Sequence, residues 1–424
     1  MNRGDIDLGS MSCFRIANES VIRNAKTFKE MNCTTHKYFV LCESGLDFLL
    51  KRYHVETEEL YKYVTLDPLT FSVYWNLSPS HSPSPDNTRT AMATKWGVVS
   101  AGKICHDFVT AVQSIPEGGQ HEFVAIAARS LASAKDFATT HNIPRAYGCY
   151  EELAKDPDVE VVYIGTVASH HFAVGKLMLE NGKHVLMEKP FTLNLKQTKI
   201  LIKIARREKC FLMEAVWTRF LPAYKLLMEL IEKDTIGDIV HVNVKFGIPL
   251  LSVERVMTKA VGGGTILDLG IYTINAVTMV YKGEKPKKIA AVGHLNDDGV
   301  DITMSSSLLY NNNRTANIAS NALAEFPNDL VITGTEGQIR VPSPFWCPTT
   351  VITDEKTYEF PLPETIRPCN FTNSSGLRFE AMEVRECLKK GALESEIMPL
   401  KDTETMTAIS DEIRRQLGVV FDAD

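Results

Sequence analysis

A lysine and a tyrosine, each beside a turn marked by proline or glycine, could carry out acid/base chemistry together. Lys189 follows an apolar run in "VLMEKP" (185–190), and Tyr272 follows a glycine-rich turn in "GGGTILDLGIYTI" (262–274). Oxidation of a secondary alcohol needs a base for the hydroxyl proton, and tyrosine, with a pKa of about 10, is a poor base at neutral pH. A nearby cation favours the tyrosinate. We therefore predict that Tyr272 is the acid/base and that Lys189 assists it by its charge.

The same residues also have ordinary structural explanations. Buried Glu and Lys side chains are rare unless they are paired, so Glu188 and Lys189 lie either at a solvent-exposed sheet edge or at a ligand. Tyr272 could be a core tyrosine. Asp268 stands one helical turn before Tyr272 and could orient it or the substrate, or could equally cap the helix. We predict a catalytic role for Tyr272, Lys189 and Asp268.

The turn "VVSAGKIC" (98–105) follows an apolar run and carries part of a dinucleotide-binding fingerprint. Ser100, Gly102 and Cys105 fill the three glycine positions of the pattern Gly-x-Gly-x-x-Gly/Ala, so only the central glycine is retained. That glycine lets the backbone approach a pyrophosphate, where a side chain would collide. We predict a dinucleotide site at this turn, with Lys103 and Ile104 at the start of the helix.

The segment "AARSLASA" (127–134) predicts which dinucleotide binds. An NAD site would place an acidic residue here for the ribose hydroxyls, whereas this chain has Arg129 and Ser130. A guanidinium and a hydroxyl suit a 2′-phosphate. We predict NADP as the cofactor. The alternative is that Arg129 is a solvated residue at the start of a loop.

Apolar runs that alternate with helical segments predict a Rossmann dinucleotide-binding domain over residues 92–215. The runs are "WGVVS", "FVAIAA", "VEVVYIG", "HVLME" and "CFLMEA". Ser130 and Asn194 stand where helix N-caps are expected, and Gly182 closes a third helix. Right-handed crossovers make such a segment a doubly wound parallel sheet.

Residues 216–424 begin with one predicted helix, "WTRFLPAYKLLMELIEK" (217–233), and continue with long alternations of apolar and polar residues. These include "DIVHVNVKFG", "KKIAAVGHL", "DITMSSSLLY" and "RTANIASNA", which indicate a mainly antiparallel sheet with one covered face. The predicted fold class is therefore α/β plus α+β, a Rossmann domain followed by an open-faced sheet domain for substrate binding. The uncovered face predicts a homodimer packed through this sheet.

Residues 1–91 show no sustained alternation of strands and helices. The stretch "LSPSHSPSPDNTRTAM" (77–92) is crowded with Ser, Pro, Asn and Thr, as in a linker. We interpret residues 1–91 as an extension or linker of unknown structure. An alternative start or a gene-model error is a second explanation, because Met92 is followed directly by a short apolar strand.

The composition of the 424-residue chain argues against several classes of partner. A formal net charge of −6 provides no basic surface for nucleic acid or anionic lipid. We see neither a signal peptide nor a run approaching the roughly 20 apolar residues of a membrane span. The nine cysteines include no Cys-x-x-Cys pair, which favours reduced thiols in the cytoplasm. The sequence also contains no His/Cys cluster, so we predict no metal site.

The segment "MEKPFTLN" (187–194) resembles the glucose-fructose oxidoreductase and inositol dehydrogenase family, and the resemblance runs from Lys95 to Phe421. Members pair a Rossmann domain with an open-faced sheet domain and transfer hydride with NAD(P). "MEAVWTRFLPA", "FWCPTT" and "CNFTNSSG" look closest to its dihydrodiol-oxidising branch, because Tyr272 stands where most sugar-acting relatives carry His. The resemblance implies an NADP-dependent dehydrogenase for a small-molecule diol or sugar, namely trans-dihydrodiols of aromatic hydrocarbons or aldopyranoses such as D-xylose. Two alternatives stay open, namely another sugar or inositol dehydrogenase of the same family and a catalytically idle NADP-binding regulatory protein.

The resemblance carries the same two catalytic roles to Tyr272 and Lys189 and implies further contacts. Thr166 and His171 are retained from the loop Thr-Pro-Asn-x-x-His, whose Pro and Asn are lost, and His171 is expected by the nicotinamide ribose. A cis Lys189–Pro190 bond is compatible with this turn, although X-Pro bonds are seldom cis.

The implied cofactor contacts also include Glu188, Pro190 and Arg219, and Arg219 could instead make a surface ion pair. Aromatic walls suit the face of a cyclohexadiene diol or a sugar ring. The aromatic residues at matching positions are Trp217, Phe246, Trp346 and Phe371. Each of them alone could equally be a core residue.

Overall fold

The structure is a computed structural model that describes residues 93–116 and 120–424 in full. Within residues 1–92 it describes only the backbone of β1 (Phe14–Arg15), β2 (Glu30–Cys33), β3 (His36–Phe39), β4 (Val64–Asp67) and β5 (Ser72–Trp75). These strands form a three-stranded and a two-stranded sheet in a unit that spans Met1–Pro85. The interpretation of residues 1–91 as an extension or linker otherwise lies outside the described residues.

A six-stranded parallel sheet begins the second unit, Asp86–Asp424. Its strands are β6 (Thr94–Val99), β7 (His121–Ala127), β8 (Arg145–Tyr147), β9 (Val161–Ile164), β10 (His184–Glu188) and β11 (Leu212–Ala215). They lie in the order β11-β10-β9-β6-β7-β8, and every neighbouring pair is parallel. The order reverses between β6 and β9, which is the switch point where doubly wound sheets bind ligands. The Rossmann prediction is confirmed.

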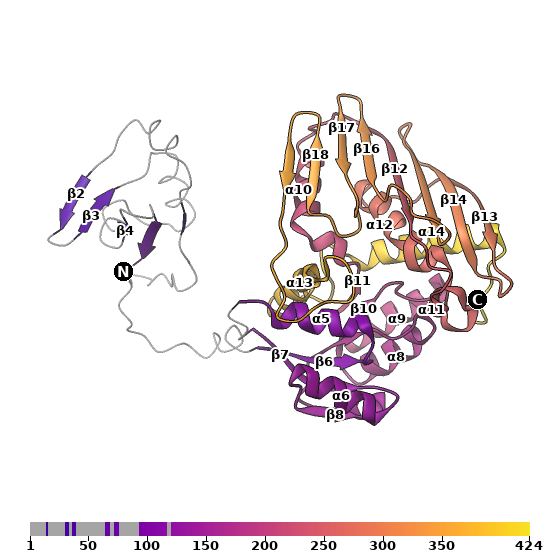
Figure 1. Cartoon of the computed structure of the whole chain (residues 1–424), viewed down its shortest axis with the longest axis horizontal. Helices are drawn as coiled ribbons and strands as arrows, with labels where there is room; N and C mark the ends of the chain where they lie inside the picture. The colour runs from indigo at the N-terminus through magenta and orange to yellow at the C-terminus, as the bar shows by residue number, and fades with distance from the viewer. Residues whose placement is uncertain are drawn as a thin grey trace. The chain divides into compact units, whose positions relative to one another are not determined.

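Helices connect these strands and pack around the sheet (Figure 1). They are α5 (Lys103–Gln113), α6 (Leu131–His141), α7 (Tyr150–Lys155), α8 (Ala168–Glu180) and α9 (Leu195–Glu208). Both predicted N-caps are confirmed, because the side chains of Ser130 and Asn194 accept hydrogen bonds from backbone N–H groups three residues ahead. Gly182 has φ +75° just beyond α8, where a left-handed residue ends the helix.

The segment that follows β11 is not the single predicted helix. A 3₁₀ turn, η2 (Trp217–Phe220), comes first, and α10 (Pro222–Glu232) starts at a proline. Proline has no backbone N–H to donate, so it suits the first turn of a helix and interrupts any helix that would continue through it. The break turns Trp217 toward the second domain, where it contacts Tyr272.

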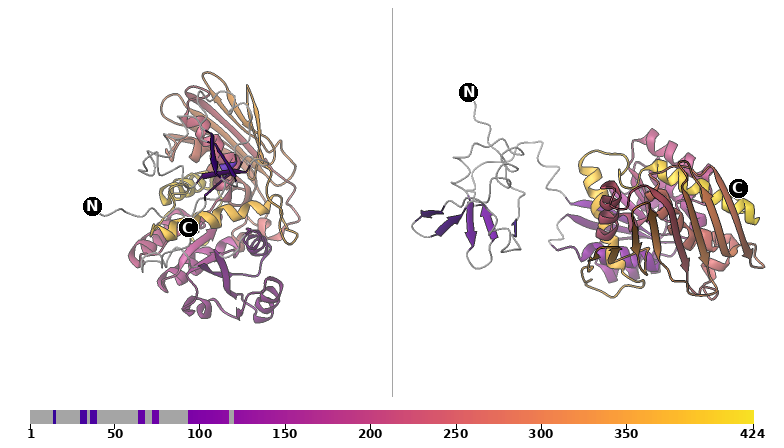
Figure 2. Two further views of the ribbon diagram at one scale, coloured as in Figure 1. Left: turned by 90° about the vertical axis from the view of Figure 1, so that its left-hand side faces the viewer. Right: turned by 90° about the horizontal axis from the view of Figure 1, so that it is seen from above.

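The second domain is built on an eight-stranded sheet in the order β13-β14-β15-β12-β16-β17-β18-β19. The strands are β12 (Ile239–Gly247), β13 (Lys288–Leu295), β14 (Asp301–Leu309), β15 (Thr315–Asn321), β16 (Leu330–Gly334), β17 (Gln338–Val341), β18 (Thr350–Thr353) and β19 (Thr357–Glu359). Only β12 and β15 pair in parallel, so the sheet is mainly antiparallel as predicted. Helices cover one of its faces and leave the strands of the other face bare (Figure 2).

Further helical segments precede β13 and close the chain. Before β13 come α11 (Glu254–Met257), η3 (Lys259–Val261), the π-helix η4 (Ile266–Gly270) and α12 (Ile271–Val280). After β19 come η5 (Ser374–Leu377), α13 (Arg378–Lys389) and α14 (Leu400–Leu417). The sequence patterns did not predict α13 and α14, and α14 packs against both α12 and α9, so it joins the two domains.

Residues Lys259–Val280 form the one helical run in the described ranges that is long and apolar enough to cross a membrane. However, 89% of the run's most apolar window is buried inside the protein. Packing in the core therefore accounts for its apolar character, and this run is the one that carries Tyr272.

Candidate active site

A cavity of about 580 Å³ lies at the carboxyl ends of the parallel strands and is closed by residues of the second domain. Most residues nominated from the sequence line it. They are Ser100, Gly102, Lys103, Ile104, Arg129, Thr166, Glu188, Lys189, Pro190, Trp217, Phe246, Asp268, Tyr272, Trp346 and Phe371. Ser130, His171 and Arg219 do not line it. The tertiary structure thus gathers at one place residues that are spread over more than half of the chain.

Lys189 follows the last residue of β10 and reaches from the Rossmann domain to the π-helix η4. Its ammonium donates hydrogen bonds to the backbone oxygen of Asp268 at 2.9 Å and to Asp268 Oδ1 at 3.1 Å. The Lys189–Pro190 peptide bond is cis. Glu188 accepts hydrogen bonds from the hydroxyl of Tyr163 at 2.5 Å and from the backbone N–H of Lys189 at 3.1 Å. The charged pair at this strand end therefore faces a cavity and not a solvent-exposed sheet edge.

Tyr272 projects into the cavity from the first turn of α12. The indole N–H of Trp217 donates a hydrogen bond to its hydroxyl at 3.0 Å. Burial raises the pKa of Tyr272 well above its ordinary value, the Glu188 carboxylate raises it further, and the Trp217 hydrogen bond lowers it. Lys189 Nζ lies 5.0 Å from the centre of the Tyr272 ring, over its face. This differs from the expectation of a tyrosinate, because Asp268 neutralises the ammonium and the phenol is buried.

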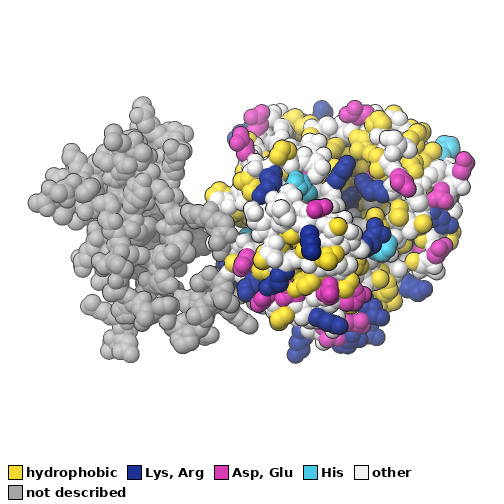
Figure 3. Space-filling view, turned by 60° about the horizontal axis from the view of Figure 1, so that its bottom comes forward, with side chains coloured by type: hydrophobic (Ala, Val, Ile, Leu, Met, Phe, Trp, Pro, Cys, Tyr) yellow, Lys and Arg dark blue, Asp and Glu magenta, His cyan; other side chains and the backbone are white. Residues whose placement is uncertain are grey.

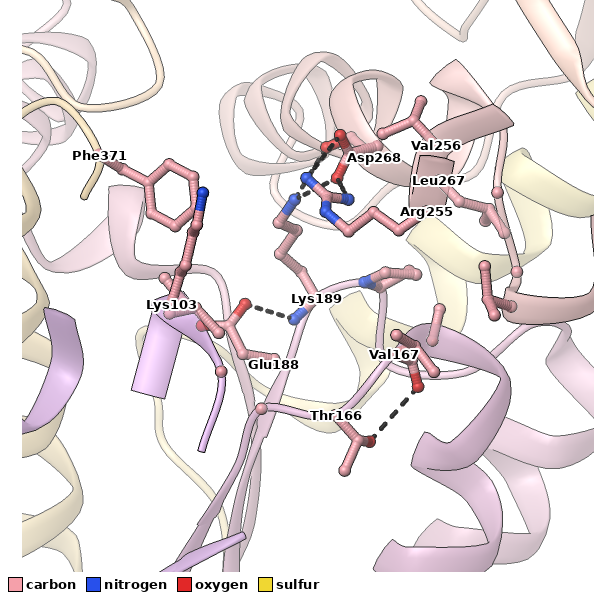
Figure 4. A pocket seen from close by; sticks show the side chains of 18 of the residues that line it. Lys103, Thr166, Val167, Glu188, Lys189, Arg255, Val256, Leu267, Asp268 and Phe371 are labelled. Carbon is pink, nitrogen blue, oxygen red and sulfur yellow. Dashed lines mark hydrogen bonds and ion pairs between the residues drawn. The ribbon is translucent and has the colours of Figure 1, made fainter. Parts of the chain in front are cut away.

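Asp268 is held between two cations (Figure 4). Besides Lys189, Arg255 donates to Asp268 from Nη1 to Oδ1 at 2.8 Å and from Nη2 to Oδ2 at 3.3 Å. Burial alone would raise the pKa of Asp268, but the charges of Lys189 and Arg255 hold it well below its ordinary value. Arg255 is a cavity residue that sequence reasoning missed, since a lone arginine in "SVERVMTK" carries no local signal.

The turn before α5 has the properties of a pyrophosphate site. No side chain among the described residues caps α5, its first turn has no acidic residue, and Gly102 is its N-cap. The free N–H groups of a helix start bind anions. A Cβ on Gly102 would point between Ser100 Oγ and the Gly165 carbonyl, at 3.4 and 3.7 Å, so the glycine keeps this approach open. Ser100 adopts φ +95°, the left-handed conformation that a glycine would take at this first position.

Cys105 occupies the third glycine position of the fingerprint and is fully buried. A Cβ on Gly165, at the end of β9, would lie only 2.5 Å from Cys105 Sγ. The larger side chain in the helix is therefore accommodated by a glycine in the neighbouring turn. The helix and the strands still pack closely, and the residues present fit a dinucleotide.

Arg129 lines the cavity near Tyr150. Tyr150 also lines the cavity and, like Arg255, was not predicted from the sequence. Ser130 does not line it, because its hydroxyl caps α6. His171 is buried under the turn, with Nδ1 2.7 Å from the Pro190 oxygen and Nε2 3.1 Å from the Thr166 oxygen. It supports the two strand ends, and its neighbour His170 lines the cavity instead.

The structure corrects the prediction that Arg219 contacts the cofactor, because Arg219 does not line the cavity. It is not a surface residue either. Its guanidinium is buried and donates to Asp402 Oδ2 at 2.7 Å, to Asn275 Oδ1 at 2.6 Å and to the Ile397 oxygen at 3.0 Å. Because η2 turns this side chain away from the cavity, Arg219 joins α12 to α14.

Aromatic rings form one wall of the cavity. Phe246 stacks on Trp346 with 4.0 Å between ring centres, and it forms a T-shaped pair with Tyr272 with 5.8 Å between ring centres. Phe371 comes from the loop after β19 and is 46% exposed. These rings provide flat apolar surface beside the polar group of Lys189, Asp268 and Tyr272, which suits a ring-shaped ligand that carries hydroxyl groups.

Comparisons with known proteins agree with this architecture. Residues 94–216 match the oxidoreductase family with an NAD-binding Rossmann fold, and residues 224–340 match the GFO/IDH/MocA C-terminal domain. The chain is 48% identical over 333 residues to trans-1,2-dihydrobenzene-1,2-diol dehydrogenase of Danio rerio, covering 78% of this chain and 99% of that protein. The protein of that name from Homo sapiens is 42% identical over 333 residues, with the same coverage of 78% and 99%.

Solved structures share the fold at lower identity. A 3-ketoreductase from Actinomadura kijaniata in complex with NADP and TDP-benzene has a TM-score of 0.64 at 22% identity, covering 77% of this chain and 98% of that one. An aldose-aldose oxidoreductase from Caulobacter crescentus has a TM-score of 0.65 at 20% identity, covering 76% of this chain and 97% of that one. With the two family domains matched in order and the curated relatives covered almost from end to end, this chain belongs to the GFO/IDH/MocA oxidoreductase family.

Proposed function

We propose that the protein is an NADP-dependent dehydrogenase that oxidises trans-dihydrodiols of aromatic hydrocarbons and aldopyranoses such as D-xylose. The observation that carries the proposal is that Lys189, Asp268 and Tyr272 meet in the same cavity as the anion-binding turn at Gly102. The name of the relatives at 42–48% identity supports a diol substrate. The aromatic wall of Phe246 and Trp346 supports a planar or ring-shaped one.

Tyr272 is the acid/base in this proposal, and Lys189 assists it. In the oxidation, the O–H proton of the substrate passes to the Tyr272 phenolate and the carbon-bound hydrogen leaves as hydride; in the reduction, the protonated phenol donates to the carbonyl oxygen. NADP, when bound, supplies the hydride acceptor. Because the pKa of Tyr272 is raised, the oxidation is favoured at alkaline pH and the reduction at neutral pH. Trp217 holds the phenol oxygen, and Asp268 holds Lys189 beside the ring.

The choice of NADP rests on Arg129. Its side chain lines the cavity beyond β7, where an NAD site would present an acid to the ribose. A guanidinium there pairs with a 2′-phosphate. The fold is shared with a 3-ketoreductase whose solved complex contains NADP, which is compatible with this choice.

The bare face of the eight-stranded sheet supports a homodimer. Val292 of β13 is 71% exposed and Leu309 of β14 is 44% exposed, so apolar side chains are exposed on this sheet. The bare strands of the sheet are seen in Figure 2. On the face in Figure 3, Lys and Arg side chains are interspersed with Asp and Glu, which offers nucleic acid no uniform basic surface there. The described cysteines are free thiols, which suits the cytoplasm.

A substrate panel tests the proposal. NADP or NAD is mixed with the purified protein and with trans-dihydrodiols, D-xylose, other aldoses and inositols, and formation of the reduced dinucleotide is followed by its fluorescence. Turnover of diols or xylose with NADP is the expected result. Turnover of inositol or another sugar alone would identify another dehydrogenase of the same family. Tight NADP binding without turnover of any substrate would favour a regulatory protein.

A further inference from the structure

A carboxylate in α5 holds the loop that carries Phe371. Both oxygens of Asp107 accept from the backbone N–H of Asn370, at 2.8 and 3.0 Å. The side-chain amide of Asn370 donates to Oδ1 at 2.7 Å, and the backbone N–H of Phe371 donates to Oδ2 at 2.9 Å. These contacts join residues more than 260 positions apart in the sequence.

Asp107 is fully buried, and no ion pair to it is found in the described ranges. A buried carboxylate is costly unless hydrogen bonds satisfy it, and here the N–H groups of one loop do so. Replacing such an acceptor leaves several N–H groups without a partner. The position of the loop is therefore strongly dependent on this one side chain.

Other residues of α5 and the residue after it bind the same loop. His106 Nε2 lies 3.1 Å from the Pro368 oxygen, Arg367 donates to Gln113 Oε1 at 2.9 Å, and the backbone N–H of Ile366 donates to Ser114 Oγ at 2.9 Å. The loop thus runs along the length of α5. We call residues 366–371 with these contacts the α5 clasp.

The α5 clasp connects the two halves of the cavity. Phe371 is 46% exposed and lines the cavity, so core packing alone does not hold it there. Asn370 also donates to the backbone oxygen of Lys103, in the first turn of α5, at 3.4 Å. Lys103 and Phe371 both line this cavity (Figure 4). The first turn of α5 is where the pyrophosphate would bind, and Phe371 is part of the substrate wall.

We infer that Asp107 is a positioning residue that sets substrate affinity by fixing Phe371 over the cavity, and that dinucleotide binding at the start of α5 strengthens this fixation. The part of the inference that concerns substrate affinity rests on the proposed function. Asp107 touches neither substrate nor cofactor, so its effect passes through the loop.

The test compares Asp107→Asn with a matched control, Asp156→Asn. Asp156 is also a buried acid of the Rossmann domain that accepts a backbone N–H, from Asp158, and its side-chain partners are Arg145 and Tyr147 of β8. None of these partners lines the cavity. In Asp107→Asn, hydrogen exchange at the Asn370 and Phe371 amides should accelerate, and KM for the substrate should rise roughly tenfold, as for the loss of hydrogen bonds to one charged group. The value of kcat should change little. Asp156→Asn should lower the melting temperature without either effect.

Two further arms keep the outcome decisive. If Asp107→Asn does not fold, Asn370→Ala replaces it, and it should raise KM and accelerate exchange of the Phe371 amide. Adding NADP should slow exchange of the Asn370 and Phe371 amides in the unmodified protein and much less in Asp107→Asn. Fast amide exchange in Asp107→Asn with unchanged KM would overturn the positioning role, and an exchange rate indifferent to NADP would overturn the coupling. If no substrate turns over, the proposed function fails, while the exchange arm still tests the clasp.

Discussion

Lys189 and Asp268 form an ion pair, with 3.1 Å between Nζ and Oδ1, although 79 positions separate them in the sequence. One comes from the end of a Rossmann strand and the other from the π-helix that leads into α12. The pair holds the ammonium over the Tyr272 ring, 5.0 Å from the ring centre. The charge of Lys189 therefore acts on the phenol together with its counterion.

The first prediction concerns Tyr272 and Lys189. Tyr272→Phe removes only a hydroxyl, so folding and NADP binding should survive while turnover falls by about 10²-fold or more, as for a lost general acid or base. Lys189→Met should be similarly inactive. Because both act on one proton transfer, the double mutant should be little worse than either single mutant. The prediction is tested by measuring single-turnover hydride transfer and thermal melting for all three variants. Near-normal turnover in a well-folded Tyr272→Phe would exclude Tyr272 as the acid/base.

The second prediction concerns the pH dependence set by Asp268. Its carboxylate raises the pKa of Tyr272, so Asp268→Asn should lower that pKa. The pH at which the rate of alcohol oxidation reaches half of its alkaline maximum should then move to lower pH. The pH profile of kcat/KM measures this, with Asp156→Asn as the control that should not move. A shift toward higher pH in Asp268→Asn would show that Asp268 acts mainly by holding Lys189 in place.

The third prediction is the cofactor preference. Arg129 lines the cavity where the 2′-phosphate is expected, so Arg129→Asp should reverse the preference from NADP to NAD by adding a repelling charge. Titration of both dinucleotides against the two proteins measures the effect. Lys95 also lies in the Rossmann domain with a partly exposed side chain but does not line the cavity, so Lys95→Asp is the control. Unchanged NADP affinity in Arg129→Asp would place the 2′-phosphate elsewhere.

The fourth prediction is the oligomeric state. The bare sheet face with Val292 should pack against a second copy, so light scattering at micromolar concentration should report twice the chain mass of 47.3 kDa. A charge on this face, as in Val292→Asp, should weaken the dimer because it would be buried without a partner. Val292 is exposed in one chain, so the fold should tolerate the change. A monomer in the unmodified protein would contradict the prediction.

The fifth prediction is a pH dependence of stability that comes from Glu214. Burial raises the pKa of this carboxyl to about 7, while Phe191 N–H donates to its Oε1 at 3.0 Å. The carboxyl of Glu214 has a pKa of about 4.3 in the unfolded chain. At a pH between this value and the higher pKa of the folded protein, only the folded state keeps the proton on Glu214. The stability contributed by Glu214 is thus fully present below the lower value and is lost as pH rises toward 7.

Glu214→Gln keeps an acceptor for Phe191 and removes the titration. The free energy of unfolding in the variant should therefore fall less steeply with pH, by up to about 1.4 kcal/mol per pH unit in this range. Urea unfolding of both proteins across the range measures the difference. Parallel pH profiles for the two proteins would mean that Glu214 does not titrate there.

Local features of this protein were readable from its sequence because they depend on neighbouring residues. The alternation of strands and helices, the N-caps at Ser130 and Asn194 and the glycine turn at Gly102 each follow from the chemistry of a few consecutive side chains. Pro222 also carries a local signal, because a proline starts α10 and so divides the segment predicted as one helix. The pairing of Lys189 with Tyr272 is contained in no local pattern, and it followed from the chemistry that alcohol oxidation needs, with support from the family resemblance.

The tertiary structure decided which side chains reach the cavity. Arg255 joined the site because its guanidinium reaches Asp268 of η4, and His170 replaced His171 there because α8 turns His171 under the strand ends. Arg219 does not line the cavity, because its guanidinium donates to Asp402 of α14. Such outcomes depend on the direction of each Cβ and on partners in other elements, which lie 13 positions away for Arg255 and 183 positions away for Arg219. A pattern of consecutive residues encodes the element, but contacts between distant elements determine which of its faces meets the ligand.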